Sequence, residues 1–181
     1  MNIFFLDKDP EIAVSALTNQ HVVKMVLETG QLLSTAHRVL DGVHTIGTNR
    51  VGHKKQIWFF RDEEKEKLIY KPTHFNHPIA KWVRKSKQNY MWTYNYFTAI
   101  AKEFELRFNK KHKTYEKLKD ILKEPPKNID NIGFTPIVPA VPSKYIGKNV
   151  IETYRAYYEG EKLLTDYDID RYNFYIEKKE G

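Results

Sequence analysis

One stretch of the chain, NQHVVKMVLETGQLLSTAHR at residues 19–38, has the composition of a helix that is buried on nearly all sides. Its polar side chains, at about 100° per residue, fall within one arc of about 100°. They are Gln20, His21, Lys24, Glu28, Gln31, Thr35 and Arg38. Apolar side chains cover nearly all of the remaining surface, so other segments must pack around this helix.

The narrow polar arc has two interpretations, because an unpaired polar group at full burial costs about 1–3 kcal/mol. In the first, Lys24 and Glu28 form an i,i+4 ion pair on a solvated edge. In the second, the arc lines a cleft in which Glu28 serves as acid, base or electrostatic stabiliser, while Lys24 or His21 holds its charge state. His21 and Glu28 lie two turns apart, so they can contact different parts of one ligand. His37 points to the apolar side and is interpreted as a hydrogen-bonded core histidine.

Capping signals predict the other helices. Asp9 before Pro10 predicts an N-cap and a short helix to about residue 17. The same signal at residues 77–78 begins the longest predicted helix, to about residue 109, with an apolar face at steps of three and four. Further helices are predicted from residue 114 and over residues 147–164. NIFFL at residues 2–6 fits either a short strand or an extended arm on the core.

Two segments lack helical periodicity. Residues 41–56 contain three glycines and few apolar anchors, which is typical of a surface loop. Residues 125–142 hold five prolines and predict an ordered, extended connection. Residues 57–72, with apolar clusters around a charged run, fit helix and strand equally. For 181 residues without an internal repeat, we predict a mainly α-helical fold: one compact domain over residues 1–181 with long central helices.

Composition excludes several classes of protein. The hydrophobic fraction of 41% excludes wholesale disorder, and no apolar run approaches the roughly 20 residues that span a membrane. The start, MNIFFLDKDP, does not resemble a secretory signal, and the absence of cysteine excludes disulfides, so we expect a cytoplasmic protein. Thirty Lys and Arg against 23 Asp and Glu give a net charge of +7, which favours a polyanionic partner.

Two basic segments are candidate nucleic-acid contacts. At the start of the long predicted helix, free amide groups and the helix dipole favour phosphate. TYRAYYEGEK at residues 153–162 interleaves aromatic and basic residues, and stacking on an aromatic ring is worth about 1–3 kcal/mol per base. The candidate residues are Lys81, Arg84, Lys85, Tyr154, Arg155, Tyr157 and Tyr158. A solvated lysine face and a core-capping helix explain the two segments equally well.

Metal and cofactor sites are not predicted. His74 and His77 have the H-x-x-H spacing, but no cysteine or clear carboxylate partner completes a set of ligands. The chain also has no Gly-rich phosphate loop, no G-x-S-x-G and no H-E-x-x-H.

Three segments resemble the pyrimidine-dimer DNA glycosylase family of the phage endonuclease V type. NQHVVKMVLE resembles the helix on which a histidine precedes the family's catalytic glutamate by seven positions, the spacing of His21 and Glu28. HPIAKWVRKSKQNYMW resembles the family's long basic helix, and TYRAYYEGEK its aromatic and basic C-terminal segment. The whole chain is more closely similar to a group of small phage-encoded proteins that share the patterns DP…HVVKM.LET.QLL…AHR and HP…W…S…NY.W.

The resemblance implies a helical domain that binds duplex DNA, flips a nucleotide and attacks its sugar C1′ with the N-terminal amine. A Schiff base and β-elimination follow in that scheme. Glu28 would position and stabilise the intermediate, His21 would belong to the wall of the site, and the segment near Tyr157 would contact DNA. An α-amine has a pKa near 8, which leaves a usable neutral fraction. The family exposes its amine by losing the initiator methionine before a small residue, whereas Asn2 is bulky, so we expect Met1 to stay.

Two positions depart from the family pattern. The family has arginines immediately before and three residues after its glutamate, where this chain has Leu27 and Gln31. We therefore predict a DNA-binding protein of the glycosylase and AP lyase type, acting on damaged or modified bases with Glu28 as its acidic group. In the alternative, the chain sequesters or processes a free nucleotide. That pocket would be lined by Asn2, His21, Lys24, Glu28 and Gln31.

Overall fold

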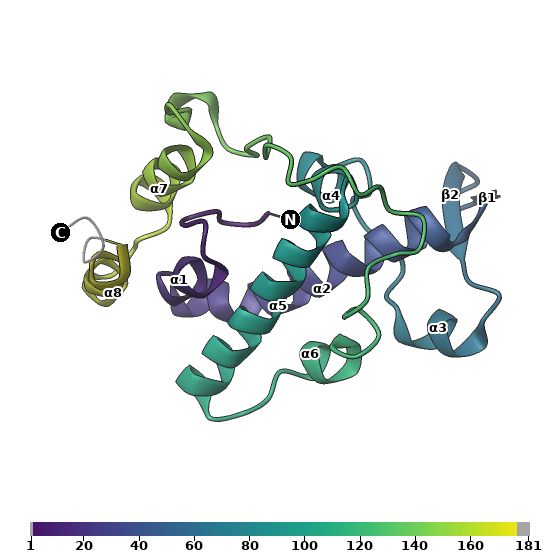
Figure 1. Cartoon of the computed structure of the whole chain (residues 1–181), viewed down its shortest axis with the longest axis horizontal. Helices are drawn as coiled ribbons and strands as arrows, with labels where there is room; N and C mark the ends of the chain where they lie inside the picture. Colours follow the sequence, from purple (N-terminus) through teal and green to yellow (C-terminus); the bar gives the residue numbers. More distant parts are fainter. Residues whose placement is uncertain (1, 177–181) are drawn as a thin grey trace.

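The computed structural model describes residues 2–176, which form eight α-helices and one β-hairpin (Figure 1). Two long helices, α2 (Asn19–Asp41) and α5 (Lys87–Phe108), pack against each other at the centre. The others are α1 (Pro10–Ser15), α3 (Glu63–Leu68), α4 (Pro78–Val83), α6 (Lys113–Leu118), α7 (Val150–Glu161) and α8 (Asp166–Ile176). The prediction of a mainly α-helical fold with long central helices is confirmed. None of the described helices is long and apolar enough to cross a membrane.

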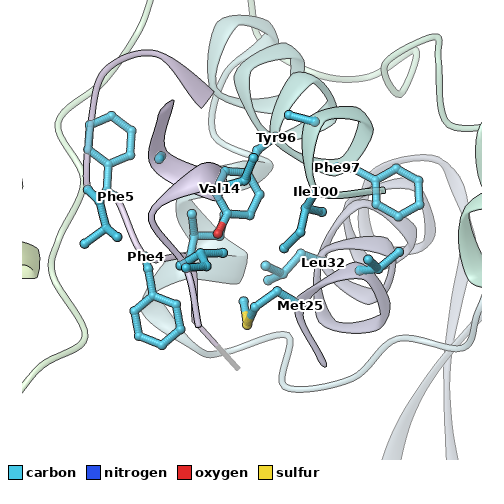
Figure 2. Packing of buried hydrophobic residues seen from close by; sticks show 14 of the residues in the cluster. Phe4, Phe5, Val14, Met25, Leu32, Tyr96, Phe97 and Ile100 are labelled. Carbon is cyan, nitrogen blue, oxygen red and sulfur yellow. The ribbon is translucent and has the colours of Figure 1, made fainter. Parts of the chain in front are cut away.

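The hydrophobic core lies between α2 and α5. Figure 2 shows Met25 and Leu32 of α2 facing Ile100 of α5, with Val14 of α1 closing the same interior. All four side chains are buried, and complete burial of a side chain of this size stabilises the fold by about 1.5–3 kcal/mol. The helix predicted from residue 19 is therefore buried over most of its apolar surface, although Val23 and Leu27 are exposed.

The first residues form an extended arm and not a strand. Ile3, Phe4, Phe5 and Leu6 are all buried, and Figure 2 shows the rings of Phe4 and Phe5 pointing to opposite sides. Phe4 packs on the His21 ring at 4.6 Å between centroids. Because side chains alternate along an extended chain, Phe4 and Phe5 anchor opposite sides of the arm in the core.

The surface loop predicted for residues 41–56 is wrong. These residues contribute most of an antiparallel hairpin, β1 (Val43–Thr48) with β2 (Lys54–Phe59). Two glycines serve the hairpin geometry. Gly52 has a φ of +81° in the turn, and a Cβ on Gly47 would lie 2.6 Å from Ile57 Cδ1. Glycine count alone does not distinguish such a hairpin from a loop.

The single helix predicted over residues 78–109 is also wrong, because it is broken into α4 and α5. Ser86 is fully buried and caps α5: its hydroxyl accepts the amide of Asn89 at 3.1 Å. The side chain of Asn89 in turn donates to the carbonyl of Trp82 at 2.8 Å. A serine that accepts a backbone amide competes with helix continuation, and here the cap prevails.

The chain after residue 125 wraps over the helices. The proline-rich segment is extended, as predicted, until a short 3₁₀ turn at Ser143–Tyr145. The carbonyl of Thr135 in this segment accepts the Trp82 indole N–H at 2.8 Å. Beyond α7 the structure has a further helix, α8, which is not among the helices predicted from the sequence. Arg171 of α8 donates to the carbonyl of Ser15 at 3.0 Å and pairs with Glu103, which joins α8 to α1 and α5.

Candidate functional site

A polar cavity of about 280 Å³ lies between the N-terminal arm, α2 and α7. The arc predicted on α2 supplies three of its lining residues, His21, Lys24 and Glu28. Gln31 is half-buried one turn further on and is not among the described residues that line the cavity. The complete lining is Asn2, Phe4, His21, Lys24, Met25, Glu28, Ala140, Tyr157 and Lys162.

The carboxylate of Glu28 is held between a cation and an amide. Its side chain is only 14% exposed; Oε1 lies 3.1 Å from Lys24 Nζ, and Oε2 accepts the backbone N–H of Asn2 at 3.3 Å. The Asn2 side chain is itself fixed. Its Nδ2 donates to the Ala140 carbonyl at 3.1 Å, and its Oδ1 accepts the Tyr154 hydroxyl at 2.9 Å. The start of the chain is therefore tied to the acid; Met1 lies outside the described residues.

His21 is a neutral member of the cavity wall. Burial, followed by the charges of Lys162 and Lys24, lowers the pKa of His21 to about 4. Its Nδ1 lies 2.7 Å from the Tyr158 hydroxyl, which already accepts the amide of Thr18 at 2.9 Å. A hydroxyl can donate one hydrogen bond and accept two, so this contact holds the neutral ring in place in either tautomer.

The three tyrosines of α7 differ in whether a ligand can reach them. Tyr154 and Tyr158 are fully buried and leave no exposed ring for a base to stack on. Arg155 donates to the carbonyl of Leu6 at 2.9 Å, which holds the arm. Tyr157 lines the cavity, with Lys162 Nζ 4.8 Å from the centre of its ring. Only Tyr157 of the three predicted tyrosines therefore remains available to a ligand at this site.

The predicted basic group on the long helix is placed differently from the prediction. Lys81 and Lys85 are exposed, and burial lowers the pKa of the half-buried Arg84. Arg84 is the C-cap of α4 and Lys85 precedes Ser86, the N-cap of α5, so these cations lie at the junction of two helices and not within the first turn of one long helix. None of the three is among the described residues lining the cavity.

The far half of the α2 arc is a buried network. Arg38 is fully buried, pairs with Glu66 and donates to the carbonyl of Tyr70 at 3.1 Å. Burial lowers the pKa of His37 to about 4, and its Nε2 lies 2.9 Å from the Tyr90 hydroxyl. His37 is thus the hydrogen-bonded core histidine that was predicted. The Lys24–Glu28 ion pair of the first interpretation and the cleft of the second both occur in the first half of the arc, whereas the buried network of the second half fits neither.

Sequence reasoning missed two features of this cavity. Lys162 and Ala140 line it from positions more than 100 residues beyond Glu28, and no short motif links them to that residue. The apolar side chains of Val23 and Leu27 are also 46% and 41% exposed, which places them on the open face of α2 beside Lys24. Within residues 2–176, no group of three or more His, Cys, Asp or Glu side chains could hold a metal ion.

Comparison with known proteins connects this geometry to a family. The family model described as pyrimidine dimer DNA glycosylase matches residues 1–116, well over half of the chain. The chain belongs to this family. The match to the pyrimidine dimer DNA glycosylase family includes the arm and α2, hence Asn2, His21, Lys24 and Glu28, whereas Tyr157 and Lys162 lie beyond it. Comparison with curated proteins and with solved structures gave no match.

Proposed function

We propose that this chain is a DNA glycosylase that acts on damaged or modified bases in duplex DNA, with the Glu28 cavity as its active site. One observation carries the proposal: the amide of Asn2 is hydrogen-bonded to Glu28 within a polar cavity. The chemistry that the family resemblance implies needs an acid and the start of the chain together. The net charge of +7 supports binding to a polyanion.

In this proposal the N-terminal amine is the nucleophile, on Met1 or on Asn2 once Met1 has been removed. The nitrogen of Asn2 lies 3.3 Å from Glu28 Oε2, within reach of proton transfer. The amine lone pair forms a bond to sugar C1′ while the bond from C1′ to the base breaks, and the base leaves with that electron pair. The adduct opens to a Schiff base, and β-elimination of the 3′ phosphate cuts the strand.

The other cavity residues take supporting roles. Glu28 exchanges protons with the sugar and stabilises the positive charge of the Schiff base. His21 offers a neutral imidazole in the cavity wall, and Lys24 offers a cation 61% exposed to an approaching phosphate. Tyr157 and Lys162 supply a ring and a charge for the adjacent nucleotide. The exposed Lys81 and Lys85 remain proposed contacts to the DNA backbone.

The family match supports DNA over the alternative of a free nucleotide. The cavity, at about 280 Å³, is close to the lower end of the range of about 300–1,000 Å³ for pockets that enclose whole small molecules, so its size suits one sugar of a longer strand as well as a small free ligand. Binding of an isolated nucleotide is therefore the competing outcome of the experiment below.

The experiment incubates the purified chain with ultraviolet-irradiated duplex and with duplex containing an abasic site, in the presence of borohydride. We expect strand cleavage and a covalent protein–DNA adduct, and peptide mass analysis locates the adduct at the N-terminal residue. Intact mass shows whether that residue is Met1 or Asn2. If no adduct and no cleavage form, while a free nucleotide raises the melting temperature, the nucleotide alternative replaces this proposal.

A further inference from the structure

The β1–β2 hairpin is an exposed extension at the end of α2, separate from the cavity (Figure 1). Most side chains from His44 to Gln56 are exposed, including the apolar Ile46 at 58% and Val51 at 75%. An isolated two-stranded hairpin is marginally stable in water, so two open faces are an unusual feature to maintain. Such a ribbon fits a surface that a partner covers.

The charged side chains of the hairpin are all basic. From Gly42 to Arg61 the sequence has no aspartate or glutamate. Arg50 lies in the turn, while Lys54 and Lys55 follow each other on β2 and so project from opposite faces. A ribbon that presents cations at its tip and on both faces is complementary to a surface of phosphates on two sides.

The turn of the hairpin is held in one conformation. The Asn49 side-chain oxygen accepts the amides of Val51 and His53, at 3.0 and 2.9 Å. The backbone of Asn49 also pairs with His53, whose carbonyl accepts its amide at 2.9 Å. Arg50 is therefore presented from an ordered turn, which reduces the entropy lost on binding.

The base of the hairpin is anchored to α2. The guanidinium of the buried Arg38 donates to the carbonyl of Trp58 on β2 at 3.4 Å and pairs with Glu66 behind it. The hairpin position is thus fixed relative to the helix that carries Glu28. Thirteen residues separate Glu28 from Asp41, about 20 Å at about 1.5 Å per residue, and each strand adds a similar length.

We propose that the hairpin is a second DNA-binding element that lies in the major groove of the duplex being processed at Glu28. The major groove, about 12 Å wide, admits a two-stranded ribbon. The part of α2 beyond Glu28 and the strands together span about 40 Å at most, which places the contact within about 12 base pairs of the damaged nucleotide. This inference rests on the proposed function, because it assumes that the cavity acts on duplex DNA.

The test replaces the three hairpin cations together, Arg50→Gln, Lys54→Gln and Lys55→Gln. Because all three are exposed, we expect an unchanged melting temperature. Titration of a damaged duplex at several salt concentrations should show a salt slope reduced by about 2–3, since each lost phosphate contact removes about 0.9. The wild type should also protect guanine N7 from methylation within about 12 base pairs of the lesion, and the variant should not.

A matched control is Lys110→Gln, Lys111→Gln and Lys113→Gln, which removes the same charge from exposed positions before and at the start of α6. It should change the salt slope much less. The hairpin inference is overturned if the two triple variants weaken binding equally, or if guanine N7 is not protected. Either result leaves the proposed function standing wherever wild-type cleavage occurs, whereas a wild type that neither binds nor cuts duplex ends both.

Discussion

The backbone amide of Asn2 and the carboxylate of Glu28, 26 positions apart, are joined by a hydrogen bond of 3.3 Å. Two further bonds of the Asn2 side chain, to the Ala140 carbonyl and the Tyr154 hydroxyl, keep the arm in this position. The acid on α2, the arm and α7 therefore form one site although they come from distant parts of the chain.

The tether on the arm can be tested with Tyr154→Phe. The change leaves Asn2 Oδ1 and the Ala140 amide without this buried partner, so we expect a loss of about 1–3 kcal/mol in unfolding free energy. Cleavage should fall more than duplex affinity, because the arm is then less well positioned. Tyr115→Phe is the control: its ring packs on Phe97 at 5.1 Å, away from the arm, and its removal of a hydroxyl should leave cleavage unchanged. Urea unfolding and cleavage rates measure the two effects; equal cleavage in both variants would contradict the tether.

Stability should depend on pH through His21 and His37. Burial lowers the pKa of each to about 4, below the ordinary 6.5, so the unfolded chain binds more protons between these values. The contribution to stability is complete above about pH 6.5 and is lost as the pH falls toward 4. For the deeply buried His37 the loss reaches about 3 kcal/mol at most, at about 1.4 kcal/mol per pKa unit.

Urea unfolding at intervals from pH 4.5 to 7 checks this slope. His37→Gln should lower stability at pH 7 and flatten the dependence on pH. His53→Gln, at the exposed tip of the hairpin, should leave the slope as in the wild type. A wild type equally stable at pH 5 and pH 7 would contradict the buried, neutral state of the two histidines.

Arg38 should be the most sensitive charged position. Its side chain is fully buried and donates to Glu66 and to the carbonyls of Tyr70 and Ile69, so Arg38→Met leaves buried acceptors without a donor and should cost about 1–3 kcal/mol. Lys71 pairs with the same Glu66 from a side chain 69% exposed, and Lys71→Met should cost less than about 1 kcal/mol. Thermal or urea unfolding of the two variants gives the comparison, and similar losses would show that the buried pair is not what anchors the hairpin.

The sequence predicted the cavity residues best on α2, where the geometry of one helix fixes which side chains lie on the same side. Periodicity placed His21, Lys24 and Glu28 on a common side of α2, and these three residues do line one cavity. The helical periodicity did not show which polar side chains of the same arc are buried. Arg38 is polar and yet fully buried, because Glu66 and several carbonyls satisfy it from segments that its own helix does not specify.

The errors arose where a local signal has two structural outcomes. Ser86 lies on the apolar face of a continuous periodic pattern, but its hydroxyl caps a new helix instead. The glycines of residues 41–56 indicate a turn as readily as a loop, and cross-strand pairing decides between them. Lys162 enters the cavity only because α7 packs over the arm, a tertiary arrangement that no spacing in the sequence encodes.

The central claim is that Glu28 is the acidic group of a DNA glycosylase, and cleavage of ultraviolet-irradiated duplex by Glu28→Gln tests it most directly. We expect the variant to cut at least about 100-fold more slowly than the wild type, with duplex affinity and melting temperature nearly unchanged. Glu105→Gln, an exposed position on α5, is the matched control and should cut at the wild-type rate. A Glu28→Gln variant that cuts irradiated duplex as fast as the wild type would contradict the account.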